Sequence, residues 1–354
     1  MSAAAPALPA AQAPLPVAGD GEGNGISLKG VSVHLPTASG ELQILRNVDI
    51  DVPAGKIVAL AGESGSGKST AMLAMVRLLP WGARVGGELL VGPHEVTAMG
   101  PAQMRSFRAS YARVIFQDPW SALHAMHSIG GQLVESARAA DPALSKAAAW
   151  DLSVAMLARV GIPDPEARMR SYPHQVSGGQ LQRIVIAMAL VARPRVLLCD
   201  EPTTALDVTT QEQILELLRE LNREMGLTIV IATHDLDVID GLADHLVVMY
   251  GGTVMEQGPM KEVMGNPQHP YTWSLLQAQP KRQGGDRLLT IPGRPPALDD
   301  LPPGCAFAPR CSSAAPECSA AVPALLAITA PEHRTACVRV QQAPREASVQ
   351  KGTE

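Results

Sequence analysis

The chain has 354 residues, which exceeds one typical domain and predicts a main domain with an extension. Its 29 Lys and Arg stand against 34 Asp and Glu, so the net charge of -5 and the pI near 6.0 argue against nucleic acid as a partner. The longest purely apolar stretch, Ile184 to Ala192, is about half of what a membrane-spanning helix needs, so any membrane passage must come from partner chains.

The first 25 residues are rich in Ala, Pro and Gly and contain no Lys or Arg. They lack the basic start and the unbroken apolar core of a signal peptide, and we interpret residues 1–25 as a disordered leader. From Ile26 the pattern becomes β-rich, and the apolar strand at 56–62 ends in a glycine-rich run. An apolar helix follows and stops at Pro80, so a strand, a glycine loop and a helix are predicted in that order.

Helical spacing of Ala, Leu and Met predicts a mostly helical subdomain over about 118–191. Apolar strands at 195–200 and 227–233 resume a parallel sheet, and an amphipathic helix separates them. A hairpin closes the main domain, which is predicted to span 26–260. The composition then shifts to Pro, Gly, Ala and Cys, which predicts a small loop-rich extension over 261–340 and a tail over 341–354.

The run GESGSGKST, at 62–70, predicts a phosphate-binding loop. Its glycines let the backbone wrap closely around phosphates, so that N–H groups and the start of the next helix face the negative charge. Lys68 is expected to reach the β and γ phosphates, and the Ser69 hydroxyl to bind Mg²⁺. The predicted nucleotide-binding residues of this run are Gly62, Ser64, Gly65, Ser66, Gly67, Lys68, Ser69 and Thr70.

Two carboxylates, Asp200 and Glu201, end the apolar run RVLLCD, where open α/β sheets place their ligands. We expect Asp200 to hold Mg²⁺ through water and Glu201 to polarise the attacking water as the general base. His234 follows a second apolar strand, and alone it would be interpreted as an ordinary strand-end histidine. A helix begins after the serine of the SGGQ run and offers free N–H groups to an anion; its residues are Ser177, Gly178, Gly179 and Gln180.

Together, the phosphate loop, the SGGQ run and the acidic pair resemble the ATPase subunits of ABC transporters. The resemblance implies a P-loop (RecA-like) α/β core with a β-rich N-terminal subdomain and a helical subdomain, and it implies ATP and Mg²⁺ as cofactors. It implies that His234 contacts the γ phosphate and that Gln117, in VIFQDP, senses Mg²⁺ and the attacking water. It also implies that SGGQ closes over ATP held by a second ATPase subunit, with Asp207 of TALD in the contact loop.

Longer runs narrow the resemblance to importers of oligopeptides, dipeptides and nickel: SYPHQVSGGQLQR, NPQHPYTWSLL and PPGCAFAPRC. This implies that the chain lies at the cytoplasmic face of the inner membrane and powers peptide import. It also implies these partners: two permease subunits, an extracytoplasmic binding protein, and a second ATPase that is a copy or a paralogue. Import of nickel or another chelated metal is the alternative within the class. A soluble ABC ATPase of translation or DNA repair and a redox-gated regulatory ATPase are alternatives outside it.

Two departures from the family pattern concern the nucleotide site. Leu35 occupies the position where relatives place an aromatic side chain on the adenine, so apolar contact is expected to replace stacking. In the signature run, Val176 and Leu181 replace the more usual leucine and a basic or polar residue. Both flank the glycines, so the site is expected to remain competent.

The extension holds four of the five cysteines, and their spacings of five, six and eighteen residues contain no CxxC pair, which weakens a zinc-ribbon interpretation. The resemblance implies a [4Fe–4S] cluster, with zinc and free structural thiols as alternatives. His333 is a candidate spare ligand, but we interpret it as a surface histidine, and we interpret Cys199 as a buried apolar residue. The predicted cluster ligands are Cys305, Cys311, Cys318 and Cys337.

Overall fold

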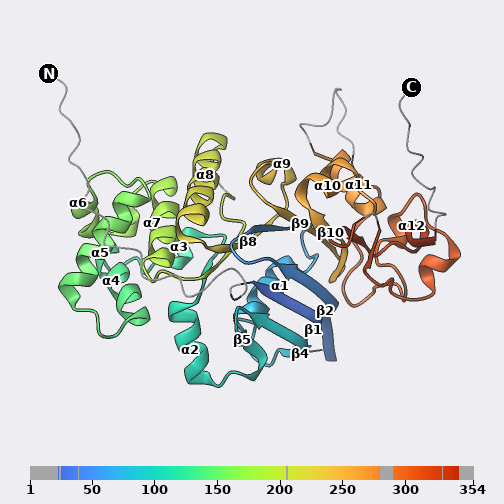
Figure 1. Cartoon of the computed structure of the whole chain (residues 1–354), viewed down its shortest axis with the longest axis horizontal. Helices are drawn as coiled ribbons and strands as arrows, with labels where there is room; N and C mark the ends of the chain where they lie inside the picture. The colour runs from blue at the N-terminus through green and yellow to red at the C-terminus, as the bar shows by residue number, and fades with distance from the viewer. Residues whose placement is uncertain are drawn as a thin grey trace, which may run out of the picture.

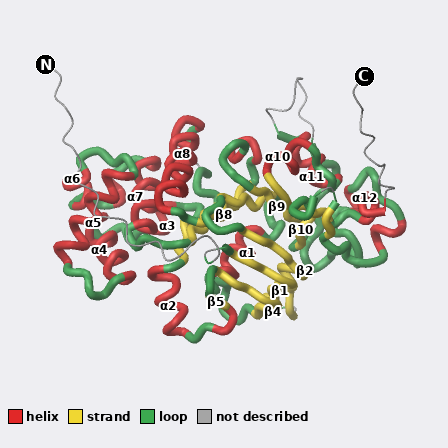
Figure 2. The backbone as a smooth tube through the Cα atoms, viewed as in Figure 1, coloured by secondary structure: helices red, strands yellow, loops and turns green. Residues whose placement is uncertain are grey.

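A computed structural model describes residues 23, 25–38, 40–204, 206–279, 290–328 and 330–342. Nearly all of the predicted leader, and the predicted tail from residue 343 onward, lie outside the described residues. Within the described part, no helix is long and apolar enough to cross a membrane. Helices gather at one end of the molecule, strands fill its middle, and loops dominate the opposite end (Figure 2).

The N-terminal segment forms a four-stranded antiparallel sheet in the order β2-β1-β4-β5. Along β1, Ile26, Leu28, Val31 and Val33 are buried, because apolar residues recur on one face of the strand. That face packs on α1, which carries the phosphate loop at its start. The strands are β1 (Ile26–Thr37), β2 (Gly40–Val52), β4 (Arg84–Val91) and β5 (His94–Glu95).

The central sheet has eight strands in the order β11-β12-β10-β9-β3-β8-β7-β6. Strands β6, β7, β8, β3 and β9 run parallel, so several strand ends meet at one edge and form the site described below. Strands β3 and β8 are buried along their whole length, which explains their continuous apolar sequences. The bounds are β3 (Ile57–Ala61), β6 (Ala112–Ile115), β7 (Val196–Asp200), β8 (Thr228–Thr233), β9 (His245–Tyr250), β10 (Thr253–Pro259), β11 (Leu326–Ala327) and β12 (Arg334–Thr335).

Helices cover the sheet and build a separate lobe. The lobe consists of α3 to α7 and lies at the opposite end of the molecule from the C-terminal extension (Figure 1). Its helices fall between residues 119 and 190. The helices are α1 (Lys68–Met75), α2 (Pro101–Ser110), α3 (Pro119–Ala122), α4 (Ile129–Ala140), α5 (Lys146–Arg159), α6 (Pro165–Met169), α7 (Gly178–Leu190), α8 (Val208–Met225), α9 (Leu236–Ile239), α10 (Met260–Gly265), α11 (Pro270–Gln277) and α12 (Val338–Gln342).

The C-terminal extension continues the core of the main domain. Strand β12 pairs with β10, so the short β11–β12 hairpin adds to the central sheet. Phe307 is 1% exposed and packs against Tyr250 and Tyr271, with ring centroids 5.4 and 5.1 Å away. Burial of such aromatic side chains stabilises a fold by roughly 1.5–3 kcal/mol each. The loop-rich extension is therefore anchored to the central sheet of the main domain.

Candidate functional site

The phosphate loop lies between β3 and α1 and requires glycine at two positions. Gly62 and Gly67 have φ of 149° and 103°. A Cβ at Gly62 would lie 2.2 Å from the carbonyl oxygen of Met249, and one at Gly67 would lie 2.8 Å from the side chain of Leu45. The loop is therefore held tightly against β9 and β2.

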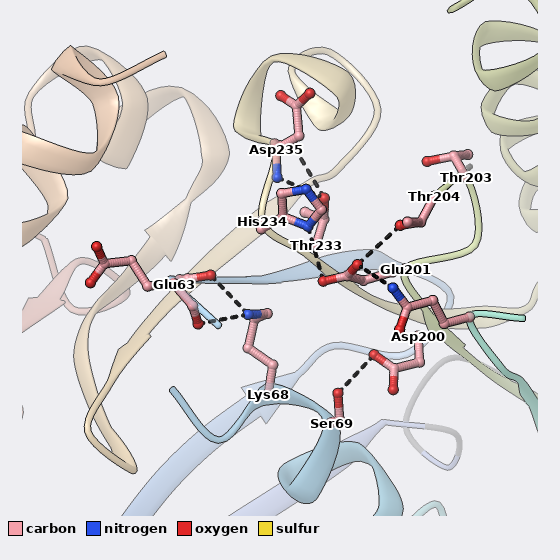
Figure 3. A network of polar contacts seen from close by, with 12 residues as sticks. Glu63, Lys68, Ser69, Asp200, Glu201, Thr203, Thr204, Thr233, His234 and Asp235 are labelled. Carbon is pink, nitrogen blue, oxygen red and sulfur yellow. Dashed lines mark hydrogen bonds and ion pairs between the residues drawn. The ribbon is translucent and has the colours of Figure 1, made fainter. Parts of the chain in front are cut away.

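Lys68 is the buried cation of this loop. Its Nζ donates hydrogen bonds to the carbonyl oxygens of Gly62 at 2.8 Å and Glu63 at 3.1 Å (Figure 3). Burial lowers the pKa of the ammonium group, and the carboxylates of Glu201, Asp200 and Glu63 oppose that shift. An incoming phosphate would supply the negative charge that this buried ammonium group lacks.

A hydroxyl and a carboxylate meet at the start of α1 and the end of β7. Ser69 Oγ donates to Asp200 Oδ1 over 2.9 Å. Burial raises the pKa of Asp200, although the hydrogen bond from Ser69 opposes the shift. Two hard oxygen ligands next to a phosphate loop form the kind of set that Mg²⁺ prefers.

Glu201 is the centre of the polar network in Figure 3. Its Oε2 accepts hydrogen bonds from Gln117 Nε2 and Thr204 Oγ1, both at 3.0 Å, and its Oε1 lies 3.0 Å from His234 Nδ1. Burial would raise the pKa of Glu201, but hydrogen bonds from His234 and Thr204 and nearby positive charge outweigh it and lower the pKa. The carboxylate is thus held ionised.

The backbone at Glu201 is strained, with φ of 45° in the left-handed region. For a non-glycine residue this conformation costs about 1–3 kcal/mol and is concentrated at functional sites. Its N–H donates to the carbonyl oxygen of Ala232 on β8 over 2.9 Å. Glu201 follows the last residue of β7, and its carboxylate contacts Gln117 and His234.

These side chains line one cleft of about 630 Å³. Ile44 and Leu298 also line it, and sequence reasoning missed both. It also missed the hydrogen bond from Thr204 to Glu201. Leu35 is not among the lining residues: it is partly buried on β1, opposite Leu42, so its expected contact with adenine stays a prediction. The predicted residues that the cleft does bring together are Ser64, Gly65, Ser66, Gly67, Lys68, Ser69, Thr70, Gln117, Asp200, Glu201 and His234.

The SGGQ run lies outside this cleft, at the exposed start of α7. The Ser177 hydroxyl accepts from the N–H of Gln180 over 3.4 Å and caps the helix. Asp207 caps α8 in the same way, accepting from the N–H and the hydroxyl of Thr210 at 2.9 and 2.7 Å. A Cβ on Gly179 would lie 2.9 Å from the Thr210 side chain, so the two helix starts abut. Both lie outside this chain's own cleft.

The four cysteines of the extension line one small cavity. Cys305, Cys318 and Cys337 are buried, Cys311 is half-buried, and all four are free thiols. Among the described residues, however, no group of three or more His, Cys, Asp or Glu is arranged to hold a metal ion. The four predicted ligands of the iron–sulfur cluster therefore share one cavity, but they are not arranged as a preformed metal site.

The interpretation of His333 as a surface histidine is wrong, whereas Cys199 is fully buried as predicted. His333 is completely buried, and its Nε2 lies 2.7 Å from Glu256 Oε1. The same carboxylate accepts the backbone N–H groups of Gln268 and His269, each at 2.8 Å. A buried carboxylate needs such partners, so Glu256 on β10 joins the residue before β12 to the start of the HPYT segment.

Comparison with protein families gives two matches along the chain. The model for "ABC transporter" matches residues 45–204, which include the phosphate loop, the SGGQ run and the acidic pair. The model for "Oligopeptide/dipeptide transporter, C-terminal region" matches residues 255–318, which include three of the four cysteines of the extension.

Relatives and solved structures agree with these matches. An ATP-binding protein of Brucella melitensis named for peptide import is 42% identical over 334 residues, covering 90% of this chain and 97% of the relative. The oligopeptide transport ATP-binding protein OppD of Escherichia coli is 42% identical over 81% of this chain and 85% of its own length. A dimeric bacterial ABC transporter cassette superposes with a TM-score of 0.60 at 27% identity, covering 66% of this chain and 98% of the cassette.

Proposed function

The chain belongs to the ABC transporter family and is an ATPase subunit, and from this premise we propose that it powers the import of di- or oligopeptides. The observation that carries the substrate class is the match of residues 255–318 to the oligopeptide/dipeptide transporter C-terminal region. Relatives named for peptide import, aligned over most of their own length, support it.

In the proposed mechanism, Lys68 and the N–H groups of the phosphate loop bind the β and γ phosphates of ATP. The oxygens of Ser69 and Asp200 fit Mg²⁺, which when bound neutralises phosphate charge. Glu201 polarises the attacking water, while Gln117 and His234 hold its carboxylate at 3.0 Å.

Completion of the site requires a second ATPase subunit, which is a copy or a paralogue. The exposed start of α7 offers the N–H groups of Gly178 and Gly179 to an anion outside this chain, and we propose that this anion is the γ phosphate of ATP bound to the partner. The solved cassette described as dimeric supports this arrangement. ATP would then close the pair and hydrolysis would reopen it.

The remaining partners follow from the transport role. We propose two membrane permease subunits that form the pathway, an extracytoplasmic protein that captures the cargo, and a position for this chain at the cytoplasmic face of the inner membrane. The relatives named for peptide import and oligopeptide transport support these proposals.

We further propose that the four cysteines hold a [4Fe–4S] cluster. Their shared cavity supports it, because Cys thiolates are the usual ligands of such clusters. A cluster would cross-link the loop-rich extension. Iron and acid-labile sulfide in the anaerobically purified chain would support the cluster; zinc in their place, or free thiols alone, would refute it.

ATP hydrolysis by the complete complex in liposomes, with its binding protein present, tests the proposed function. We expect added peptides to stimulate turnover and added nickel to leave it unchanged. Stimulation by nickel alone would establish the chelated-metal alternative, which the LHAMHSI run at 123–129 favours. Failure to isolate any membrane complex would support a soluble ATPase instead.

A further inference from the structure

One ion pair joins the C-terminal extension directly to the phosphate loop. Both terminal nitrogens of Arg310 bond the carboxylate of Glu63, with Nη1 2.6 Å from Oε2 and Nη2 3.1 Å from Oε1. The two residues are 247 positions apart in the sequence. The Arg310 side chain is 5% exposed and that of Glu63 is 25% exposed, so solvent screens the pair only weakly.

Arg310 is fixed by more than this pair. It also donates to the Tyr250 hydroxyl at 3.0 Å and to the carbonyl oxygens of Pro292 and Ile291 at 2.8 and 3.3 Å. Burial opposes its charge, but the hydrogen bonds to Glu63 and Tyr250 outweigh that effect and raise its pKa. A guanidinium group with so many fixed partners acts as a rigid connection, which an ammonium group could not reproduce.

Glu63 connects this arginine to the nucleotide site through its own backbone. Its carbonyl oxygen accepts from Lys68 Nζ at 3.1 Å, and it also accepts from the N–H of Ser66 at 3.2 Å. Its N–H donates to the Tyr271 hydroxyl at 2.9 Å. Figure 3 shows the Glu63 carboxylate pointing away from Lys68, so the side chain faces the extension while the backbone faces the site.

The other end of the connection is the cysteine-lined cavity. Arg310 ends the turn Ala308–Arg310, between Cys305 and Cys311, and the N–H of Ala308 donates to the carbonyl oxygen of Cys305 at 3.0 Å. Ala308, Cys305 and Cys311 all line the cavity. Arg310, which holds Glu63, is therefore flanked along the chain by residues that line the cavity.

We propose that Arg310 is a positioning residue for the ATP site: by clamping Glu63 it holds the phosphate loop in its binding conformation and transmits the state of the cysteine-lined cavity to nucleotide affinity. This inference rests on ATP binding by the proposed function, but not on the identity of the cargo. It does not depend on which group, if any, the cysteines hold.

Titration of the purified full-length chain with Mg²⁺ and ATP in a calorimeter tests the clamp. Arg310→Ala should weaken ATP binding at least about tenfold, equivalent to ~1.4 kcal/mol. Arg310→Lys should give an intermediate affinity. The matched control is Arg334→Ala, which removes the 3.6 Å ion pair between the extension and Asp51 on β2 without touching the cysteine-lined cavity, and it should leave affinity unchanged.

A double-mutant cycle separates positioning from general damage to the fold. If Arg310 acts through Glu63, Arg310→Ala should weaken ATP binding no further in a Glu63→Ala background. Additive losses, or wild-type affinity in Arg310→Ala, would overturn the clamp. A wild-type chain that binds no ATP would refute the proposed ATP site as well, so the two failures are distinguishable.

A second arm tests the connection to the cavity. Cys311→Ser should weaken ATP binding when Arg310 is present and should have no further effect in Arg310→Ala. The same loss in both backgrounds would show that the cavity acts by another route and would overturn the transmitting role. Thermal unfolding of each variant confirms that the chains compared are folded.

Discussion

Replacing Glu201 with glutamine removes one negative charge from the cleft while it keeps the length and planarity of the side chain. The glutamine oxygen can still accept from Gln117 and Thr204, which both bond the same carboxylate oxygen, and its amide can donate to His234 Nδ1 when the imidazole carries its proton on Nε2. The three contacts at 3.0 Å therefore survive, and only the ability to take a proton is lost. Loss of a general base lowers turnover by ~10²-fold or more, or ~2.7 kcal/mol.

We expect Glu201→Gln to bind ATP at least as tightly as the wild type, because a negative charge near the phosphates has been removed. Steady-state phosphate release measures turnover, and nucleotide titration measures binding in the same preparation. The matched control is Glu216→Gln on α8, where an exposed 3.0 Å pair with Arg219 is lost and turnover should not change. Turnover within a few-fold of wild type in Glu201→Gln would refute its role as base.

Three further changes test other parts of the site. Lys68→Ala should abolish measurable ATP binding in calorimetry, because the buried ammonium group is lost; retained binding would place the phosphates elsewhere. Ser177→Arg should leave ATP binding by the isolated chain intact but eliminate turnover of the assembled complex, and unchanged turnover would contradict a partner-facing signature. Burial lowers the pKa of His269 from 6.5 to about 3. Between these two pH values the unfolded chain binds a proton at this residue and the folded chain does not, so stability falls as the pH falls. Stability should fall by ~1.4 kcal/mol per pH unit in that window. His269→Asn, which keeps a cap for the N–H of Tyr271, should reduce this slope in denaturant titrations, and an unchanged slope would assign it to other groups.

Local sequence patterns were sufficient to predict much of the site. The glycines of the phosphate loop, the apolar strand before Asp200 and the serine cap of α7 each lie within a few neighbouring residues, so period and spacing predict them. The convergence of strand ends at one sheet edge then follows from parallel topology. The three-way bonding of Glu201 to Gln117, Thr204 and His234 required the fold itself.

The extension shows where sequence patterns fail. Its Pro- and Gly-rich composition carries no periodicity, so nothing in the sequence indicates that Phe307 is buried, that His333 pairs with Glu256, or that Leu298 lines the nucleotide cleft. These contacts join segments far apart in the chain. The same holds for Arg310, whose partner lies in the phosphate loop.

Uptake of a labelled oligopeptide into vesicles that contain the complete complex is the most direct test of whether ATP hydrolysis at this site drives peptide import. With ATP on the side that carries this chain, we expect the wild type to accumulate the peptide against a gradient. We expect no accumulation with Glu201→Gln, although the complex assembles and binds ATP. Accumulation that is unaffected by Glu201→Gln, or no peptide uptake beside active nickel uptake, would contradict the proposed function.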